Sequence, residues 1–319
     1  MSNLDRLGDS ISVPITTDQD GYLGRECPRS DCRGYFKITP GTGLPGHPPC
    51  HCAYCGHVGG HYEFFTRAQV EYAKSVALNR ITGAFLKDLK RMEFETKPRG
   101  PFGIGLSLKV SGRSHPIHYY REEELETEVV CDQCGLRYAI YGVFAHCPDC
   151  GIHNSLQILT KNLELVRQML DLSARTDESV SGAIVANALE DAVAAFDGFG
   201  REACRIHSEQ AANPTEVARL SFQNLAGARQ RVAKQFDIDI ASGVDPDQWA
   251  LCLQCFQKRH LLAHKMGVVD DEYVRATADP TAVVGRKIRI DRDEAQALTH
   301  ALARIGTFLR QQLNRQGTV

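Results

Sequence analysis

Two Cys-x-x-Cys pairs, separated by twelve residues, constrain the fold of this chain more than any other feature. They are Cys131 with Cys134 and Cys147 with Cys150, and a glycine follows the second cysteine of each pair. Each pair places two thiolates on one side of a tight turn, and two such turns can close a tetrahedron around one Zn²⁺. The glycines can take a positive φ, which lets the backbone fold back beside a metal. The spacing predicts a zinc ribbon over residues 129–153.

A second cysteine group lies near the N-terminus and predicts another ribbon over residues 21–62. The best ligand quartet there is Cys27, Cys32, Cys52 and Cys55. Cys50 could replace Cys52, and three histidines lie nearby, namely His51, His57 and His61. A site closed by four protein ligands leaves no position for water, so both zinc ions are expected to be structural. Three alternatives remain open. The cysteines could form disulfides, the metal could only stabilise a small domain, or the ribbons could present a rigid surface to RNA, DNA or protein.

Length and composition limit the kinds of protein that this sequence can encode. The 319 residues allow two or three domains, and a net charge of −2 gives no global basic signature of a nucleic-acid binder. The N-terminus lacks the basic start and apolar block of a secretory signal, and no apolar run reaches membrane-spanning length. We therefore expect a cytoplasmic protein with no membrane partner, whose twelve cysteines are reduced and whose paired cysteines bind metal.

The rest of the chain divides by its apolar periodicity. Residues 1–20 are expected to be a loose tail, and residues 63–128 an amphipathic helix followed by a β segment. Thr66 and Gln69 form a capping-box pattern before the helix over 66–93, and alternation at 106–110 indicates a strand. Residues 154–319 repeat the helical spacing at 155–172, 178–211, 214–236, 245–267 and 291–313. The expected fold class is α+β, with small β ribbons followed by an all-α bundle.

One helical segment carries residues that suit catalysis. In KRHLLAHKMGVVDDEYV, His260 and His264 lie four residues apart and so share one helix face. They could bind a metal with Asp270 or Asp271, or they could belong to a solvated basic helix end. In a third interpretation His264 is a general base and Arg259 holds charge on a phosphate. Three other cysteines, Cys204, Cys252 and Cys255, are expected in the core.

The string Arg259-His260-Leu-Leu-Ala-His264, late in a helical domain, resembles the active motif of HEPN-domain ribonucleases. The similarity extends over about residues 175–315, through the helices before and after the motif. It implies a helical domain that forms a homodimer or higher homo-oligomer and cuts RNA without metal. His264 would take the proton of the ribose 2′-OH, Arg259 would stabilise the phosphorane, and His260 would support the site. His260 stands where Asn or Asp is more usual in the family.

The resemblance also suggests a biological setting. HEPN domains often belong to bacterial toxin and antiphage systems, so a protein regulator or a phage-derived trigger is an expected partner beside RNA. The alternative is a non-catalytic zinc-ribbon adaptor that binds nucleic acid or protein. Five basic residues are candidates for an RNA groove, namely Lys258, Lys265, Arg286, Lys287 and Arg289.

Overall fold

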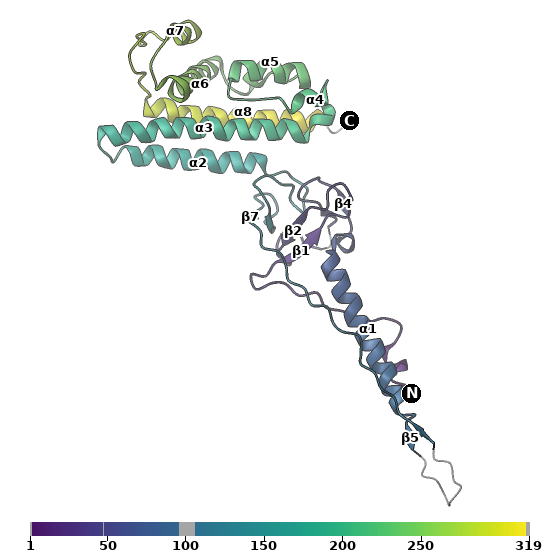
Figure 1. Cartoon of the computed structure of the whole chain (residues 1–319). Coiled ribbons are helices and arrows are strands. Elements are labelled where there is room, and N and C mark those ends of the chain that lie inside the picture. The colour runs from purple at the N-terminus through teal and green to yellow at the C-terminus, as the bar shows by residue number, and fades with distance from the viewer. Residues whose placement is uncertain (1, 47, 96–105, 317–319) are drawn as a thin grey trace, which may run out of the picture. The chain divides into compact units, whose positions relative to one another are not determined.

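The computed structural model describes residues 2–46, 48–95 and 106–316. The chain forms two compact units, Met1–Ile152 and His153–Val319 (Figure 1). The first contains the strands and the second consists of helices, which confirms the expected α+β class. Each unit has its own apolar core and is described separately below.

The N-terminal unit is built on one antiparallel sheet with the strand order β1-β2-β8-β7. These strands are β1 (Leu23–Glu26), β2 (Tyr35–Ile38), β7 (Thr127–Val130) and β8 (Arg137–Ile140). Two short pairs accompany the sheet, β3 (Cys50–His51) with β4 (Val58–Gly59) and β5 (Phe94–Glu95) with β6 (Ser107–Leu108). The strand expected at 106–110 is therefore present as β6, but it is shorter.

The central pairing of this sheet joins the two ribbon segments. Strand β2 pairs with β8 in the register Lys37 opposite Ala139 and Ile38 opposite Tyr138. Phe36, Tyr138 and Ile140 are fully buried there, in one cluster with cysteines of both segments. The two ribbons are thus halves of a single small domain with a shared core.

Helix α1 (Arg67–Lys90) begins at this sheet, and its capping box is confirmed. The Thr66 hydroxyl accepts from the Gln69 N–H at 3.1 Å, and the Gln69 side chain accepts from the Thr66 N–H at 3.2 Å. Beyond its first turns the helix leaves much of its apolar stripe exposed, including Ile81 and Phe85. The chain returns along α1, where the Asn79 side chain donates to the His115 carbonyl at 2.6 Å.

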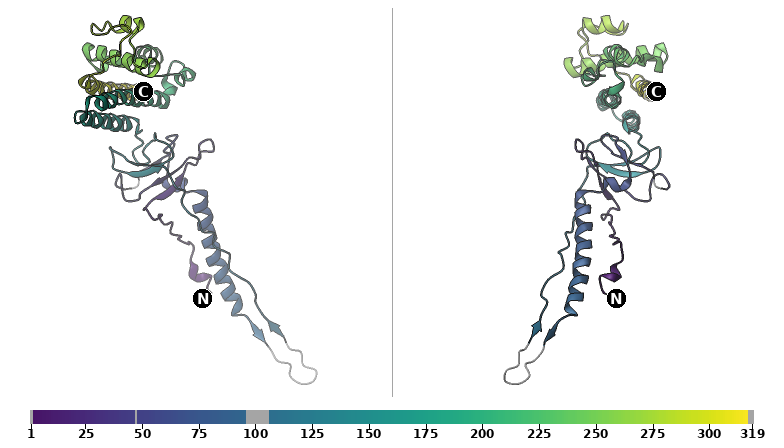
Figure 2. Two further views of the ribbon diagram at one scale, coloured as in Figure 1. Left: turned by 60° about the vertical axis from the view of Figure 1, so that its left-hand side comes forward. Right: turned by 90° about the vertical axis from the view of Figure 1, so that its right-hand side faces the viewer.

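The C-terminal unit is a bundle in which the long helices α2, α3 and α8 run side by side (Figures 1 and 2). Its helices are α2 (Ser155–Ser173), α3 (Glu178–Ile206), α4 (Pro214–Val217), α5 (Leu225–Phe236), α6 (Pro246–Lys265), α7 (Asp271–Thr277) and α8 (Arg292–Gln316). Gly306 of α8 allows close packing, because a Cβ there would lie 2.6 Å from Leu159 and 3.3 Å from Phe199. Cys204, Cys252 and Cys255 are buried in this core, as expected.

The single helix expected over 214–236 is wrong. The chain forms α4, leaves helical geometry, and starts again at α5 with Asn224 as its N-cap. Phe222 occupies the break and is fully buried, and its N–H donates to the buried carboxylate of Asp197 at 2.5 Å. Burial of this ring and its specific backbone hydrogen bond outweigh continuous helical periodicity.

Within the described residues, only α3 has the length and apolar composition that crossing a membrane requires. Its apolar side chains, among them Leu189, Val193 and Phe196, are buried in the bundle. The same composition is typical of the central helix of a helical domain.

Candidate functional site

The eight predicted cysteines form two quartets in the N-terminal unit. Within each quartet the four sulfur atoms lie within 4.8 Å of one another, in the groups Cys27, Cys32, Cys52, Cys55 and Cys131, Cys134, Cys147, Cys150. The closest Sγ–Sγ distances are 3.7 Å in the first quartet and 3.5 and 3.7 Å in the second. A tetrahedral Zn²⁺ with bonds of about 2.3 Å separates its sulfur ligands by about 3.8 Å. Both quartets therefore have the size that one zinc ion requires.

Four equivalent backbone turns position these sulfur atoms. In each, the N–H of the first cysteine donates to the carbonyl oxygen two residues beyond the second cysteine, at 2.8 to 3.0 Å. The residue directly after the second cysteine is always left-handed, with φ of 70° at Gly56, 77° at Gly135 and 70° at Gly151. In the turn of Cys32 that residue is Arg33, with φ of 47°. The longer spacing between Cys27 and Cys32 thus still produces the same turn.

The structure decides between Cys50 and Cys52. Cys52 belongs to the first quartet, while Cys50 is fully buried outside it in the core of the sheet domain. The sequence left this choice open because both residues have suitable spacing to Cys55. Cys50 lies within strand β3, whereas Cys52 follows the strand and starts the turn that carries Cys55.

Two histidines link the quartets instead of serving as ligands. His51 packs over Gly151 in the second quartet, where a Cβ would lie 2.8 Å from the imidazole. His146 packs over Gly56 in the first quartet, where a Cβ would lie 3.3 Å from its Nε2. The backbones of the two histidines also cross between the quartets. The His51 N–H donates to the Pro148 carbonyl and the His146 N–H donates to the Ala53 carbonyl, both at 2.7 Å. Each quartet therefore supports the other.

The backbone around Cys131 favours a thiolate at that position, whereas burial raises the pKa of Cys134 and Cys147 in the same quartet. Burial alone would raise the pKa of Cys131, but hydrogen bonds from the backbone N–H groups of Cys134 and Gln133 lower it. Metal ligation requires the deprotonated sulfur, so these N–H groups favour the ligand form.

The predicted catalytic residues lie at the C-terminal end of α6. His260 and His264 are exposed, and their ring centres are 4.8 Å apart, which confirms that they share a helix face. Arg259 is half-buried, and its Nε is buried without a hydrogen-bond partner among the described residues. The helix ends directly beyond, where the Gly267 N–H donates to the Leu261 carbonyl at 2.9 Å.

Asp270, one of the two acidic residues considered as a metal ligand, already has other partners. Asp270 forms an ion pair with Lys265 and caps α7 by accepting from the Tyr273 N–H at 2.8 Å. In the described part of the chain, the only close groups of three or more potential metal ligands are the two cysteine quartets. A metal site built on His260, His264 and Asp270 or Asp271 therefore has no support in the geometry.

The five basic candidates fall into two classes. Lys258 is buried in an ion pair with Glu294, at 2.6 Å from Nζ to Oε2, and Lys265 is paired with Asp270. Arg286, Lys287 and Arg289 are exposed and form no ion pair within the described residues. Lys287 lies beside the end of α6, because a β-bridge joins it to Val268. Only these last three cations are available to a ligand.

Sequence reasoning missed the role of Arg33, and the signal was local. Arg33 follows Cys32 as a glycine follows the second cysteine of the other three turns, so its left-handed backbone could have been expected. Comparison of the whole chain with models of protein families, with curated proteins and with solved structures gave no match.

Proposed function

We propose that the C-terminal unit is a metal-independent endoribonuclease of the HEPN type. The observation that carries the proposal is the exposed His260–His264 ring pair, next to an arginine whose Nε has no partner among the described residues. A helix end whose residues served only solubility would need neither paired imidazoles nor a half-buried arginine whose Nε lacks a partner among the described residues. Arg286, Lys287 and Arg289 belong to a segment that pairs with residues just beyond the end of α6, and their positive charge suits an RNA phosphate backbone.

In the proposed reaction His264 accepts the proton of a ribose 2′-OH. The 2′-oxygen then attacks the adjacent phosphorus, the bond to the 5′-oxygen breaks, and that oxygen takes a proton from a second imidazole. His260 is the second imidazole available on this helix. Arg259 would hold the charge on the non-bridging oxygens, since guanidinium matches phosphate geometry and stays protonated. The products are a 2′,3′-cyclic phosphate and a 5′-hydroxyl.

A homodimer completes this proposal. Four apolar side chains are exposed around the end of α6 and the neighbouring loop, namely Met266, Val268, Val283 and Val284. Met266 is 84 % exposed, which is unusual for a large apolar residue next to charged groups. A second copy covering this surface would bring two Arg-His motifs together. Sedimentation of wild type and Val284→Lys, with exposed Val180→Lys as control, tests the pairing.

The nuclease test compares His264→Ala with His300→Ala, an exposed histidine on α8. Because a positioned base contributes about 10²–10⁴-fold in rate, His264→Ala should lose most RNA cleavage and His300→Ala should keep it. Brief exposure to EDTA should leave cleavage intact, and a 2′-deoxy substitution at the cut position should abolish it. Equal cleavage by wild type and His264→Ala would remove the catalytic claim. RNA binding without turnover would favour the adaptor function instead.

We also propose that each cysteine quartet binds one structural Zn²⁺. Four thiolates leave no coordination position for water or substrate, so the metal would stabilise the fold and not take part in chemistry. Elemental analysis of the purified protein should give two zinc ions per chain. The Cys147→Ser variant should retain at most one.

A further inference from the structure

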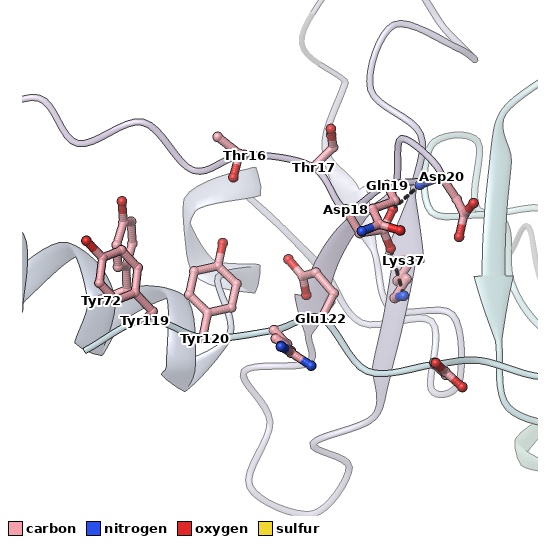
Figure 3. A pocket seen from close by; sticks show the side chains of 12 residues that line it. Thr16, Thr17, Asp18, Gln19, Asp20, Lys37, Tyr72, Tyr119, Tyr120 and Glu122 are labelled. Carbon is pink, nitrogen blue, oxygen red and sulfur yellow. Dashed lines mark hydrogen bonds and ion pairs between the residues drawn. The ribbon is translucent and has the colours of Figure 1, made fainter. Parts of the chain in front are cut away.

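A second candidate site lies in the N-terminal unit, apart from both cysteine quartets. It is a cavity of about 670 Å³ between the segment 16–20, strand β2, helix α1 and the segment 119–124 (Figure 3). Three tyrosines, four carboxylates and two cations are among the residues that line it. Neither the zinc proposal nor the nuclease proposal uses any of them.

Three tyrosines form one wall of this cavity. The Tyr72 ring lies 5.5 Å from Tyr120 at an interplanar angle of 60° and 6.0 Å from Tyr119 at 38°. Figure 3 shows their hydroxyls pointing in the same direction as the Glu122 carboxylate. Tyr119 is 80 % exposed, so one face of the cluster is free to contact a ligand. Aromatic faces carry negative potential and attract cations.

Glu122 is held rigidly beside this wall. Its carboxylate accepts from the Tyr35 hydroxyl at 2.6 Å and from Gln69 Nε2 at 2.9 Å. Gln69 is itself fully buried and donates to the Gly24 carbonyl at 3.0 Å. Because a carboxylate offers about four acceptor positions, Glu122 keeps capacity for a ligand. Its two hydrogen-bond partners are neutral, and the buried guanidinium of Arg25 is a cation close enough to interact with it.

The remaining charges favour a cationic ligand. Asp18 and Lys37 neutralise each other at 2.8 Å. Asp20 and Glu124 are exposed carboxylates at the rim, against the single guanidinium of Arg121. Burial and the nearby Glu122 carboxylate raise the pKa of Tyr120 to about 12, which keeps that ring neutral. An anionic ligand such as a phosphate would meet repulsion here.

We propose that this cavity binds an alkylated ammonium cation. The exposed side of the tyrosine cluster would contact its alkyl groups, and Glu122 would lie near its charge. The cation could be a free small molecule or the methylated lysine side chain of a peptide, because both present the same group. A neutral molecule of the same shape would lose the attraction of both the rings and the carboxylate.

Calorimetric titration with choline chloride and with 3,3-dimethyl-1-butanol, its uncharged isostere, tests the proposal. Choline should bind one per chain, and the alcohol at least about tenfold more weakly, which equals about 1.4 kcal/mol. A trimethyllysine peptide in a parallel titration identifies the source, since the tighter ligand marks the natural one. Equal affinity for choline and the alcohol, or no binding of choline and peptide, would overturn the proposal.

Variants locate the binding to this cavity. Tyr120→Leu should weaken choline binding about tenfold while Tyr120→Phe, which keeps the ring face, should bind like wild type. Glu124→Gln should weaken binding and Arg121→Gln should strengthen it, each by a few-fold and less at high salt. Tyr62→Leu, an exposed tyrosine that does not line the cavity, is the matched control. Loss of binding in Tyr62→Leu alone, or equal binding by all variants, contradicts the assignment.

Discussion

The two units of this protein are stabilised in different ways. The sheet of the N-terminal unit has strands of four residues, and cysteines make up much of its buried cluster. The C-terminal unit has helices of up to 29 residues around a core of leucine, valine, alanine and phenylalanine. Short strands with so few large apolar residues bury little surface, so we expect the first unit to need bound metal for its stability. The second can rely on burial alone.

Zinc removal should produce the largest difference in stability between the two units. Structural zinc contributes about 10–16 kcal/mol to the folding of small zinc domains, so chelation should unfold the N-terminal unit. The helical circular dichroism of the C-terminal unit should remain, and limited proteolysis should release it intact. A proteolysis pattern unchanged by chelation would contradict the metal dependence.

Two variants serve as controls for this separation. Cys50→Ser changes a buried cysteine outside the quartets, so it should keep both zinc ions. Phe196→Ala removes a fully buried ring from the helical core and should destabilise the C-terminal unit by about 3–5 kcal/mol. Its zinc content should be unchanged. Loss of zinc in Phe196→Ala would show that the two units are not independent, and loss of zinc in Cys50→Ser would show that packing of Cys50 supports the quartets.

Acid should weaken the C-terminal unit through Glu202. Burial alone would raise the pKa of Glu202, but hydrogen bonds from Arg205 and His153 lower it to about 2. A depressed carboxyl pKa stabilises the fold above its unfolded value of about 4.3, and this stabilisation is lost as pH falls toward 2. The difference amounts to at most about 3 kcal/mol.

Thermal unfolding of the helical signal between pH 5 and pH 2.5 measures this effect. Glu202→Gln should flatten the pH dependence in that window, because its side chain does not titrate. Glu190→Gln is a control, since that helix carboxylate is only half-buried and forms no ion pair within the described residues. An unaltered slope in Glu202→Gln would assign the acid sensitivity to another group, such as Asp279, whose pKa is also about 2.

The smallest expected effect on stability comes from replacing residues of positive φ with glycine. Arg33→Gly should stabilise the N-terminal unit by about 0.5 kcal/mol, because the relief of left-handed strain exceeds the backbone entropy that glycine loses on folding. Asp237→Gly makes the same change at φ 53° in the C-terminal unit, at the end of α5. Chemical denaturation followed separately for each unit should show each variant stabilising its own unit. Destabilisation by Arg33→Gly would mean that the arginine side chain contributes contacts of its own.

Local chemistry explains which features were predictable. The individual cysteine turns follow from cysteine spacing, and the start of α1 follows from Thr66 and Gln69, because partners within a few residues decide both. The pairing of β2 with β8 joins residues about 100 positions apart, and no short-range pattern encodes it. The break before α5 likewise depends on the contact of Phe222 with Asp197, which belongs to another helix.

The candidate active site was predictable to a similar extent. Helical spacing alone placed His260 and His264 on one face, and the structure confirms it. Spacing could not show that Lys258 is buried against Glu294 and that Lys287 lies beside the helix end. These outcomes depend on the packing of α8 and of the loop after α7. The catalytic role of the motif stays a prediction.

The antiparallel pairing of β2 with β8 has a consequence during biosynthesis. Strand β2 leaves the ribosome long before β8, which ends at Ile140, so for that interval one edge of β2 has no partner strand in its own sheet. An open edge of this kind can recruit a strand from another nascent chain. Early zinc capture by the first four cysteines would hold β1 and β2 in a compact hairpin until β8 arrives. The metal would then act as a safeguard against misassembly before it acts as a support of the finished domain.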